Sequence, residues 1–323
     1  MTFSTRTKNE ISRIPIGNNK AALAELSALI HMGGTIFFSG KSNIGFKITT
    51  ENPAIARRVF SLLKIKFGTQ TELSVKKNAQ LKKNNIYSIV VSSALGAEDI
   101  LLQTGIIKQN PESNVKEINY EIPKKLIEEE KCKRAYLRGA FLGGGSISDP
   151  EKTYHLEFVT FNEKYSYELC KLINSFGLSA KVVQRKNNFV VYLKEGEQIV
   201  TILNIIQAHN ALFELENIRI FKDMRNNVNR IVNCETANLS KTVNAALRQI
   251  ENIKYIKDNM GLSKLPPNLR EVAELRLNYQ EASLKELGKM LIPPIGKSGI
   301  NHRLRKIDKI AEDLKIKDNR GDR

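Results

Sequence analysis

A run of cationic and amide-bearing residues near the C-terminus has the chemistry needed to contact nucleic acid. Arginine and lysine donate hydrogen bonds to phosphates and to guanine O6 and N7, and asparagine can pair with adenine, so a helix that carries them can enter the major groove. The candidate DNA-contacting residues are Lys297, Ser298, Asn301, His302, Arg303, Arg305, Lys306 and Lys309. They share one short segment, which we expect to form a helix that begins near Ser298.

The segments around this helix have the order of a helix-turn-helix. Two prolines at 266–267 precede a predicted helix through Asn278, and Ser283 with Glu286 forms a capping box that opens a short helix to Met290. A turn leads to the last helix, whose periodicity puts its apolar residues on one face: Ile300, Leu304, Ile307, Ala311 and Leu314. Most of the polar candidates then lie opposite this face, with Asn301 and Arg303 on its flanks, and the second helix of the pair is the one expected to read DNA.

Two glycine-ended segments recur in the first two thirds of the chain, LSALIHMGGTI from Leu26 and LRGAFLGGGSI from Leu137. Both resemble the LAGLIDADG motif of homing endonucleases. In that family the two motif helices pack together at a pseudo-twofold axis, and the acid before the final glycine binds the divalent cation used to cut DNA. Gly33 and Gly144 stand at these acid positions, so the resemblance implies a helix pair and a DNA-facing platform whose catalytic acids have been lost.

Glycine cannot replace the carboxylates that phosphodiester cleavage requires, because magnesium is held by oxygen ligands beside the attacking water. Glu25, Glu157 and Asp149 lie near the motifs but at other positions, and His31 occupies the middle acid position, which is not the metal ligand in that family. We therefore predict that the chain is not an enzyme and has no catalytic residues, metal site or cofactor.

The cysteines and histidines support no metal site either. The three cysteines are Cys132, Cys170 and Cys234, and the four histidines are His31, His155, His209 and His302. They are scattered without zinc-ligand spacing, and the cysteines are expected to be buried thiols.

Each motif is followed by the same order of helices and strands. The first copy predicts a helix over 21–32, strands over 35–38 and 43–49, a helix over 53–68, and strands over 71–75 and 86–92. The second copy predicts a helix over 133–142, strands at 146 and over 154–160, a helix over 162–177, strands over 180–184 and 189–193, and a helix over 198–209. Gly68 and Gly177 are expected to cap the two inner helices at their C-terminal ends.

These observations predict an α+β fold with two pseudo-symmetric αββαββ units of LAGLIDADG type, followed by an all-α helix-turn-helix domain. The predicted boundaries are 1–115 and 116–221 for the two units, 222–260 for a linker with leading helices, and 261–323 for the helix-turn-helix. A chain of 323 residues exceeds the length at which single cores stop growing, so several domains are expected. The Asn-rich stretch after His209 suggests a hinge followed by more than one helix.

The charge balance favours a polyanionic partner. Lysine and arginine outnumber aspartate and glutamate by 51 to 34, for a formal net charge of +17. Double-stranded DNA is the expected partner, because a basic excess neutralises phosphates and releases counterions. The chain has no long apolar run and no secretory core near its start, so we expect no membrane contact and a cytoplasmic, nucleoid-associated protein.

Together these features resemble the WhiA family of bacterial DNA-binding regulators over nearly the whole chain. The resemblance is carried by the two motifs, NCETAN from Asn233, LREVAELRL from Leu269, SLKELG from Ser283 and KSGINHRLRKI from Lys297. It implies a transcriptional regulator linked to sporulation or to cell division and chromosome segregation, with RNA polymerase or another regulator as a possible further partner.

Two other functions stay open. The protein could be a chromosome-associated interaction adaptor, with the two-unit domain binding another protein while the helix-turn-helix locates it on DNA. It could also be a residual metal-dependent DNA endonuclease. The sequence names neither the operator nor the target genes.

Overall fold

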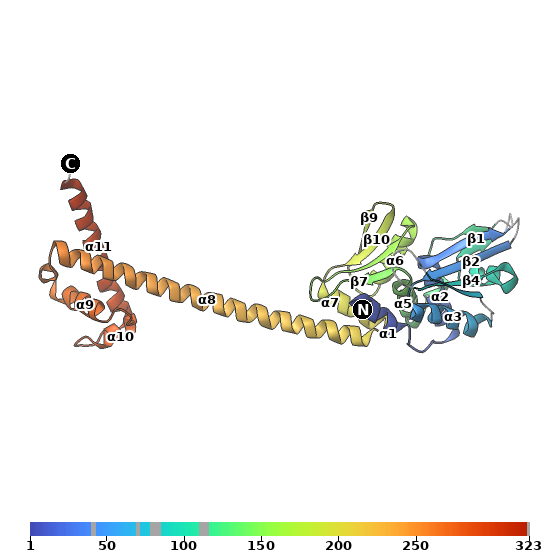
Figure 1. Cartoon of the computed structure of the whole chain (residues 1–323), viewed down its shortest axis with the longest axis horizontal. Coiled ribbons are helices and arrows are strands. Elements are labelled where there is room, and N and C mark those ends of the chain that lie inside the picture. Colours follow the sequence, from blue (N-terminus) through green and yellow to red (C-terminus); the bar gives the residue numbers. More distant parts are fainter. Residues whose placement is uncertain (40–42, 69–71, 78–84, 110–115, 322–323) are drawn as a thin grey trace. The chain divides into compact units, whose positions relative to one another are not determined.

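Figure 1 shows the computed structural model of the chain, which describes residues 1–39, 43–68, 72–77, 85–109 and 116–321. The chain divides into two compact units, Met1–Lys222 and Asp223–Arg323.

The first repeat of the first unit has the predicted order of elements. These are α2 (Asn19–Gly33), β1 (Gly34–Ser39), β2 (Asn43–Thr50), α3 (Pro53–Phe67), β3 (Glu72–Lys77) and β4 (Asn85–Val91). The strands pair antiparallel in the order β1-β2-β4-β3. The buried strand residues Phe46, Ile48, Ile89 and Val91 lie in the same core as the apolar sides of α2 and α3.

The second repeat has the same connectivity. It comprises α5 (Glu130–Gly144), β7 (Gly145–Ile147), β8 (Leu156–Thr160), α6 (Glu163–Asn174), β9 (Lys181–Arg185) and β10 (Asn188–Leu193), and it is followed by α7 (Gly196–Ile205). Its strand order, β7-β8-β10-β9, corresponds strand for strand to that of the first sheet. The predicted α+β fold with two αββαββ repeats is therefore confirmed.

Several elements of the first unit were not predicted. They are α1 (Phe3–Ile11), the short helical turns η1 (Ser93–Leu95) and η2 (Lys124–Leu126), α4 (Ala97–Gln103), and the hairpin of β5 (Ile107–Gln109) with β6 (Lys116–Ile118). They lie outside the repeated pattern, so comparison of the two halves gave no signal for them. The predicted helix over 198–209 ends earlier, at Ile205.

Asparagine side chains begin three helices of the repeats. The Oδ1 atoms of Asn18, Asn52 and Asn162 accept hydrogen bonds from Ala21 N, Ala54 N and Tyr165 N. Each bond satisfies a peptide N–H that has no partner within the first helical turn. At the other end of α3, Gly68 is the C-cap with φ of +62°. Gly177 is also left-handed but is not the cap of α6, because that helix already ends at Asn174 with Ser175 as its C-cap.

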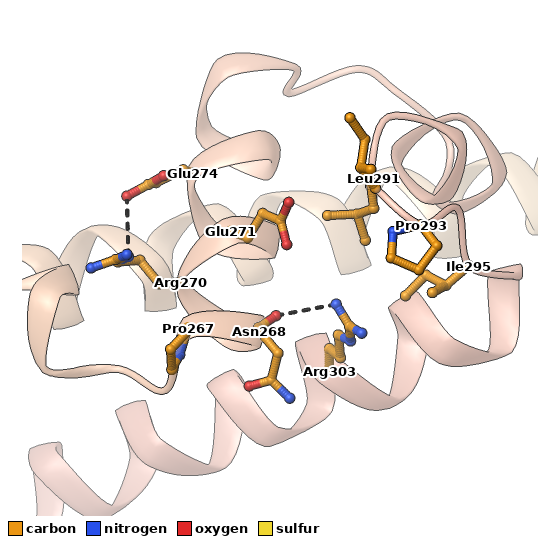
Figure 2. A pocket seen from close by; sticks show the side chains of 10 residues that line it. Pro267, Asn268, Arg270, Glu271, Glu274, Leu291, Pro293, Ile295 and Arg303 are labelled. Carbon is orange, nitrogen blue, oxygen red and sulfur yellow. Dashed lines mark hydrogen bonds and ion pairs between the residues drawn. The ribbon is translucent and has the colours of Figure 1, made fainter.

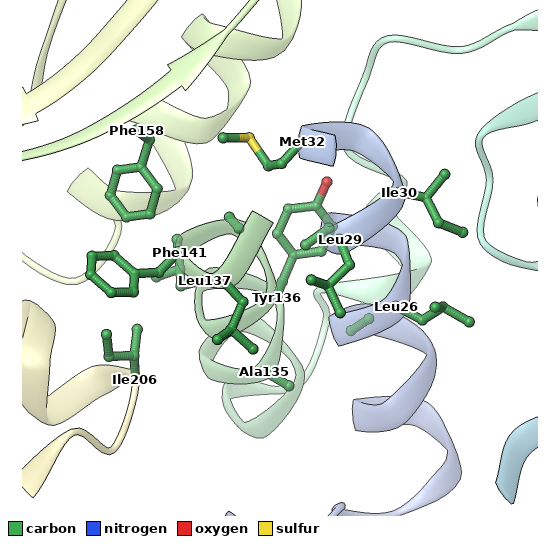
Figure 3. Close-up of a cluster of buried hydrophobic side chains, with 14 of the residues drawn as sticks. Leu26, Leu29, Ile30, Met32, Ala135, Tyr136, Leu137, Phe141, Phe158 and Ile206 are labelled. Atoms are coloured by element: carbon green, nitrogen blue, oxygen red, sulfur yellow. The ribbon is translucent and has the colours of Figure 1, made fainter. Parts of the chain in front are cut away.

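The two motif helices, α2 and α5, pack directly against each other, and this contact is called the motif seam below. Figure 3 shows side chains of both helices, among them Leu29 and Tyr136, filling the space between them. Gly139 makes the close approach possible, because a Cβ atom there would lie 2.3 Å from the carbonyl oxygen of Glu25. The small residues of the motif are therefore needed for helix packing.

The second unit consists of helices. Helix α8 (His209–Asn259) begins within the first unit and belongs to the second from Asp223 on. It is followed by the short turn η3 (Leu262–Lys264), α9 (Pro267–Asn278), α10 (Leu284–Lys289) and α11 (Lys297–Gly321). The prediction of a hinge and more than one helix after His209 was wrong, because α8 is one helix. Asparagine lowers helix propensity but does not break a helix, and the segment contains neither proline nor glycine. Ile253 and Ile256, near the end of α8, belong to the core of the second unit.

The cysteines differ from the expectation of buried thiols. Cys132 is buried, Cys170 is half-buried and Cys234 is exposed. Cys234 lies in the middle of α8, where residues 223–244 are all exposed, so the prediction of a buried thiol was wrong for this cysteine. Within the described residues, no helix combines the length and apolarity needed to span a membrane.

Candidate nucleic-acid interface

The first helix of the helix-turn-helix, α10, begins with the predicted capping box. Ser283 N donates to Glu286 Oε2 at 2.8 Å, and Glu286 N donates to Ser283 Oγ at 3.3 Å. The hydrogen bonds from Ser283 hold the pKa of the Glu286 carboxyl below its ordinary value. A helix as short as α10 depends on such contacts, because its few internal hydrogen bonds do not offset the cost of forming the first turn.

A close backbone contact fixes the turn between α10 and α11. Ile295 N donates to Gly288 O at 3.0 Å. A Cβ atom on Gly288 would lie 2.2 Å from the carbonyl oxygen of Ile295, so only glycine allows the turn to approach the helix in this way. The contact determines where α11 begins relative to α10.

The apolar face of α11 packs into the core of the second unit, as predicted. Ile300, Leu304, Ile307 and Ala311 are buried, and Leu314 is partly buried against the same cluster. Their neighbours in the cluster come from α8, α9 and α10: Ile253, Ile256, Leu269, Val272, Ala273 and Leu287. The buried face fixes the rotation of α11 about its axis and thereby selects the side chains that face solvent.

The opposite side of α11 carries most of the predicted DNA-contacting residues. Six of them are exposed, and this set is called the outer face of α11: Lys297, Ser298, His302, Arg305, Lys306 and Lys309. Within the part of the chain that the structure describes, none of its basic side chains forms an ion pair. Asn301 is half-buried at the edge of this face.

Arg303 is placed differently from the other candidates. Its guanidinium donates to the carbonyl oxygen of Asn268 in α9 at 3.4 Å, as Figure 2 shows. It also lines a cavity of about 500 Å³ together with Glu271 and Pro293. A nucleic-acid contact by Arg303 would therefore compete with its contact to α9, which sequence periodicity alone could not show.

Two further cations and one buried arginine were not singled out from the sequence. Lys285 and Lys289 are exposed on α10. Arg276 at the end of α9 is 2% exposed and donates to Ala282 O at 2.7 Å and to Gln280 O at 3.4 Å, so it holds the loop that enters α10. Burial lowers the pKa of its guanidinium. The cations of α10 could have been found by applying helical periodicity to both helices of the pair.

An interior network joins the end of α8 to α11. Asn252 donates to Asp308 Oδ1 at 2.9 Å and accepts from Lys315 Nζ at 2.9 Å. Asp308 therefore points toward α8, and the outer face of α11 carries no acid between Lys297 and Lys309.

The motif seam contains an ion-paired acid, and glycines stand at positions 33 and 144, where the motif resemblance expects metal-binding acids. Glu25 accepts from Arg58 Nε at 2.7 Å and from Arg138 NH2 at 2.9 Å, and all three side chains are buried. A Cβ atom added to Gly33, at the end of α2, would lie 3.7 Å from Gly143 O. A Cβ atom added to Gly144 would lie 2.8 Å from Val159 O.

His31 is also part of the packing of the seam. Its ring stacks on Tyr165 with centroids 4.8 Å apart, and its nitrogens lie 3.1 Å from Ser27 O and 3.2 Å from Asn119 O. Burial lowers the pKa of His31 to about 4. Burial also raises the pKa of both Tyr165 and Tyr136, whose hydroxyls are hydrogen-bonded at 3.1 Å.

The other acids named from the sequence are engaged elsewhere. Glu157 Oε2 lies 3.0 Å from His155 Nε2 and 3.3 Å from Arg185 NH1. Asp149 Oδ1 accepts from Glu151 N at 3.1 Å in a loop. Among the described residues, no group of three His, Cys, Asp or Glu side chains is arranged to hold a metal ion.

A repeated LAGLIDADG-like fold joined to a helix-turn-helix defines the class of protein. Three family descriptions match in chain order: the WhiA N-terminal LAGLIDADG-like domain over residues 19–107, the WhiA LAGLIDADG-like domain over 133–225, and the WhiA C-terminal HTH domain over 228–311. The chain belongs to the WhiA family.

Relatives match along almost the whole chain. The protein named "Probable cell division protein WhiA" from Clostridium botulinum (strain Hall) is 61% identical over 98% of this chain and 99% of its own. A protein of the same name from Alkaliphilus metalliredigens is 58% identical over 97% of this chain and 98% of its own. The crystal structure of full-length WhiA from Thermatoga maritima is 30% identical, with a TM-score of 0.59, and covers 97% of this chain and 99% of that one.

Proposed function

We propose that this protein is a non-catalytic, sequence-specific DNA-binding protein that acts as a transcriptional regulator. The observation that carries the proposal is the outer face of α11, which presents exposed cations without acidic partners among the described residues. The opposite face of the same helix is buried, so the cationic side is held outward by the core of its unit. Such a surface suits the major groove, where phosphates supply affinity and base edges supply specificity.

The roles of the individual residues follow from their positions on α11. Arg305 and Lys306 lie at the centre of the outer face, and Lys297, Lys309 and Ser298 extend it toward phosphates. His302 and Asn301 lie on the same helix, near enough to Arg305 to contact neighbouring base edges. Arg303 contributes less in this proposal, because its guanidinium already donates to Asn268 O.

The absence of catalysis is supported by the two motif positions. Neither Gly33 nor Gly144 supplies a ligand atom, and Glu25, the acid within the seam, is held by two arginines. A hard cation requires carboxylate or carbonyl oxygens that are free to coordinate it. We therefore propose that the two-unit domain, 1–221, serves as a scaffold, with no cofactor and no metal.

The biological setting that we propose follows the family. The relatives are named as cell division proteins, and we extend this role to control of genes for cell division and chromosome segregation, or for sporulation. We further propose a cytoplasmic, nucleoid-associated protein, with RNA polymerase or another regulator as a partner. We also propose domain boundaries after residues 115, 221 and 260.

The decisive experiment compares two double variants that remove the same charge. Arg305→Ala with Lys306→Ala removes the centre of the outer face, whereas Lys254→Ala with Lys257→Ala removes two exposed cations from the end of α8. The probe is a duplex selected by the purified full chain from a random pool. We expect the first double variant to bind it at least about tenfold more weakly and with a smaller salt slope, and the second to bind like the wild type.

Equal losses in the two double variants would show only a general charge effect and would contradict the assignment to α11. Equal affinity of all three proteins would remove α11 from the interface. If the α11 variant lost DNA binding in solution but kept its genomic occupancy, the adaptor function would replace this proposal. Magnesium-dependent cleavage of the selected duplex by the wild type would establish the endonuclease instead.

A further inference from the structure

Besides the ion-paired Glu25 of the motif seam, the first unit contains a second polar region. A cavity of about 470 Å³ is lined by residues of α1, by the start of α3 and by the end of α5. Its charged and amide side chains are Lys8, Asn9, Arg13, Glu51, Asn52 and Arg57. The family resemblance assigned no role to any of them.

The lining has an excess of positive charge. Three cations, Lys8, Arg13 and Arg57, line the cavity together with one carboxylate, Glu51. Across the described part of the chain, none of the three cations forms an ion pair. Surface cations usually keep a shell of water, but here three of them converge on one concave surface, which raises the local concentration of anions.

Lys8 is the most constrained of the three. Its side chain is half-buried on α1, and its Nζ lies 5.8 Å from the centroid of the Phe141 ring in α5. Burial lowers the pKa of this ammonium to about 8, and no nearby carboxylate offsets the effect. A bound anion would supply the missing counter-charge and would raise this pKa back toward its ordinary value.

Hydrogen-bonding groups at the start of α3 complete the lining. Asn52 donates to Asn9 Oδ1 at 2.8 Å, which joins the start of α3 to α1. Asn52 also caps α3, a helix of 15 residues whose N-terminal end borders the cavity and carries a partial positive charge. The amides are thus held in place before any ligand arrives.

We propose that this cavity binds a small phosphorylated ligand. Phosphate matches the site better than a carboxylate does, because its dianion can accept from both guanidinium groups and from the Lys8 ammonium at once. The volume lies within the range of sites for small molecules, so it can hold a ligand larger than inorganic phosphate, and Asn9 and Asn52 can contact its uncharged part. The site is separate from the outer face of α11 and does not depend on the proposed DNA binding.

The test uses the full chain, inorganic pyrophosphate as the probe, and titration calorimetry at constant ionic strength without DNA. We compare Arg57→Met, which removes an exposed cation from the cavity, with Lys64→Met, which removes an exposed cation from the same helix outside it. Lys8→Met keeps the apolar stem over Phe141 and removes the ammonium. We expect saturable binding by the wild type and Lys64→Met, and binding weaker by about tenfold or more in Arg57→Met and Lys8→Met.

A titration that does not saturate in the wild type, or an equal loss in Arg57→Met and Lys64→Met, would overturn the proposal. A further arm uses the Arg305→Ala, Lys306→Ala variant and a random-sequence duplex as competitor. If the duplex displaces pyrophosphate from this variant, the cavity holds DNA phosphates and the small-ligand proposal is wrong. If it does not, the phosphate source is a small molecule. Because Arg57 is exposed, its variant keeps the test interpretable even if Lys8→Met lowers stability.

Discussion

The motif seam and the outer face of α11 both contain arginines, but they use them in opposite ways. In the seam, Arg58 and Arg138 are buried and share the carboxylate of Glu25. On α11, Arg305 and Lys306 are exposed, and among the described residues neither has an acidic partner. A buried charge requires a partner in the fold, whereas an exposed unpaired cation keeps its field available to a ligand.

This difference distinguishes charged residues that hold the fold together from charged residues that are exposed to solvent. The seam keeps the close helix contact of the LAGLIDADG motif, and its charged residues are fully engaged in holding that contact together. Helix α11 likewise buries its apolar side in a core, but its charged side is exposed to solvent. The exposed cations of α11, which have no acidic partner among the described residues, therefore support the proposal that the second unit binds DNA.

The largest effect is expected from removing the shared carboxylate of the seam. Glu25→Ala leaves two buried guanidinium groups without their acid, and we expect the free energy of unfolding to fall by about 3–5 kcal/mol. Urea denaturation followed by circular dichroism measures it. The matched variant Glu130→Ala removes an exposed carboxylate that pairs with Arg134 on α5, and it should cost less than about 0.5 kcal/mol.

The next largest losses of stability are expected at two glycines that lie against backbone carbonyl oxygens. Alanine at Gly139 or at Gly288 would put Cβ within 2.3 Å or 2.2 Å of a carbonyl oxygen, and each should destabilise the protein by about 3 kcal/mol. Gly296→Ala, where a Cβ meets nothing within 4 Å, is the control. Under conditions in which both variants stay folded, only Gly288→Ala should weaken DNA binding. A comparable loss in Gly139→Ala would show that the seam also contributes to the interface.

The free energy of unfolding is expected to depend on pH through His31. Its pKa in the folded protein, about 4, lies below the ordinary value of 6.5, so between these values the unfolded chain takes up a proton that the folded protein does not. Stability is therefore unaffected by His31 above pH 6.5 and falls below it, by about 1.4 kcal/mol per pH unit or about 2 kcal/mol by pH 5. Urea titrations at pH 7 and pH 5 should show this extra loss in the wild type relative to His31→Gln. Parallel losses in both proteins would contradict a His31 imidazole that stays neutral in the folded protein.

The smallest difference in stability is expected between variants of Gly33 and Gly144, the two positions at which the motif resemblance expects acids. Alanine at Gly144 would bring Cβ to 2.3 Å from Met32 Cε and to 2.8 Å from Val159 O, while alanine at Gly33 would bring Cβ to an ordinary 3.7 Å from Gly143 O. We expect Gly144→Ala to be less stable than Gly33→Ala by about 1 kcal/mol in thermal unfolding. Equal stability would mean that strand β8 yields easily and that both positions can still accept a side chain.

Periodicity and local signals were sufficient for the repeated elements and for the helix-turn-helix. The capping box of Ser283 and Glu286, and the apolar spacing of α11, are set by residues a few positions apart, and the structure confirms both. The contact of Arg303 with Asn268 joins residues far apart in sequence, so helical periodicity could place Arg303 on a flank but could not find its partner. The same limit applies to Glu25, whose two arginines come from α3 and α5.

The order of elements, the net positive charge and the presence of glycine at positions 33 and 144 can be read from the sequence, because each is a property of residue type and of local spacing. Which charged side chains have a partner, and which are exposed without one, depends on the tertiary structure. Glu25 and Asp308 each bind residues of their own unit. Among the described residues, no acidic partner contacts Arg305 and Lys306, or the cavity cations Lys8, Arg13 and Arg57. The reason is physical: charge pairing depends on distances between side chains from different elements, and packing sets those distances.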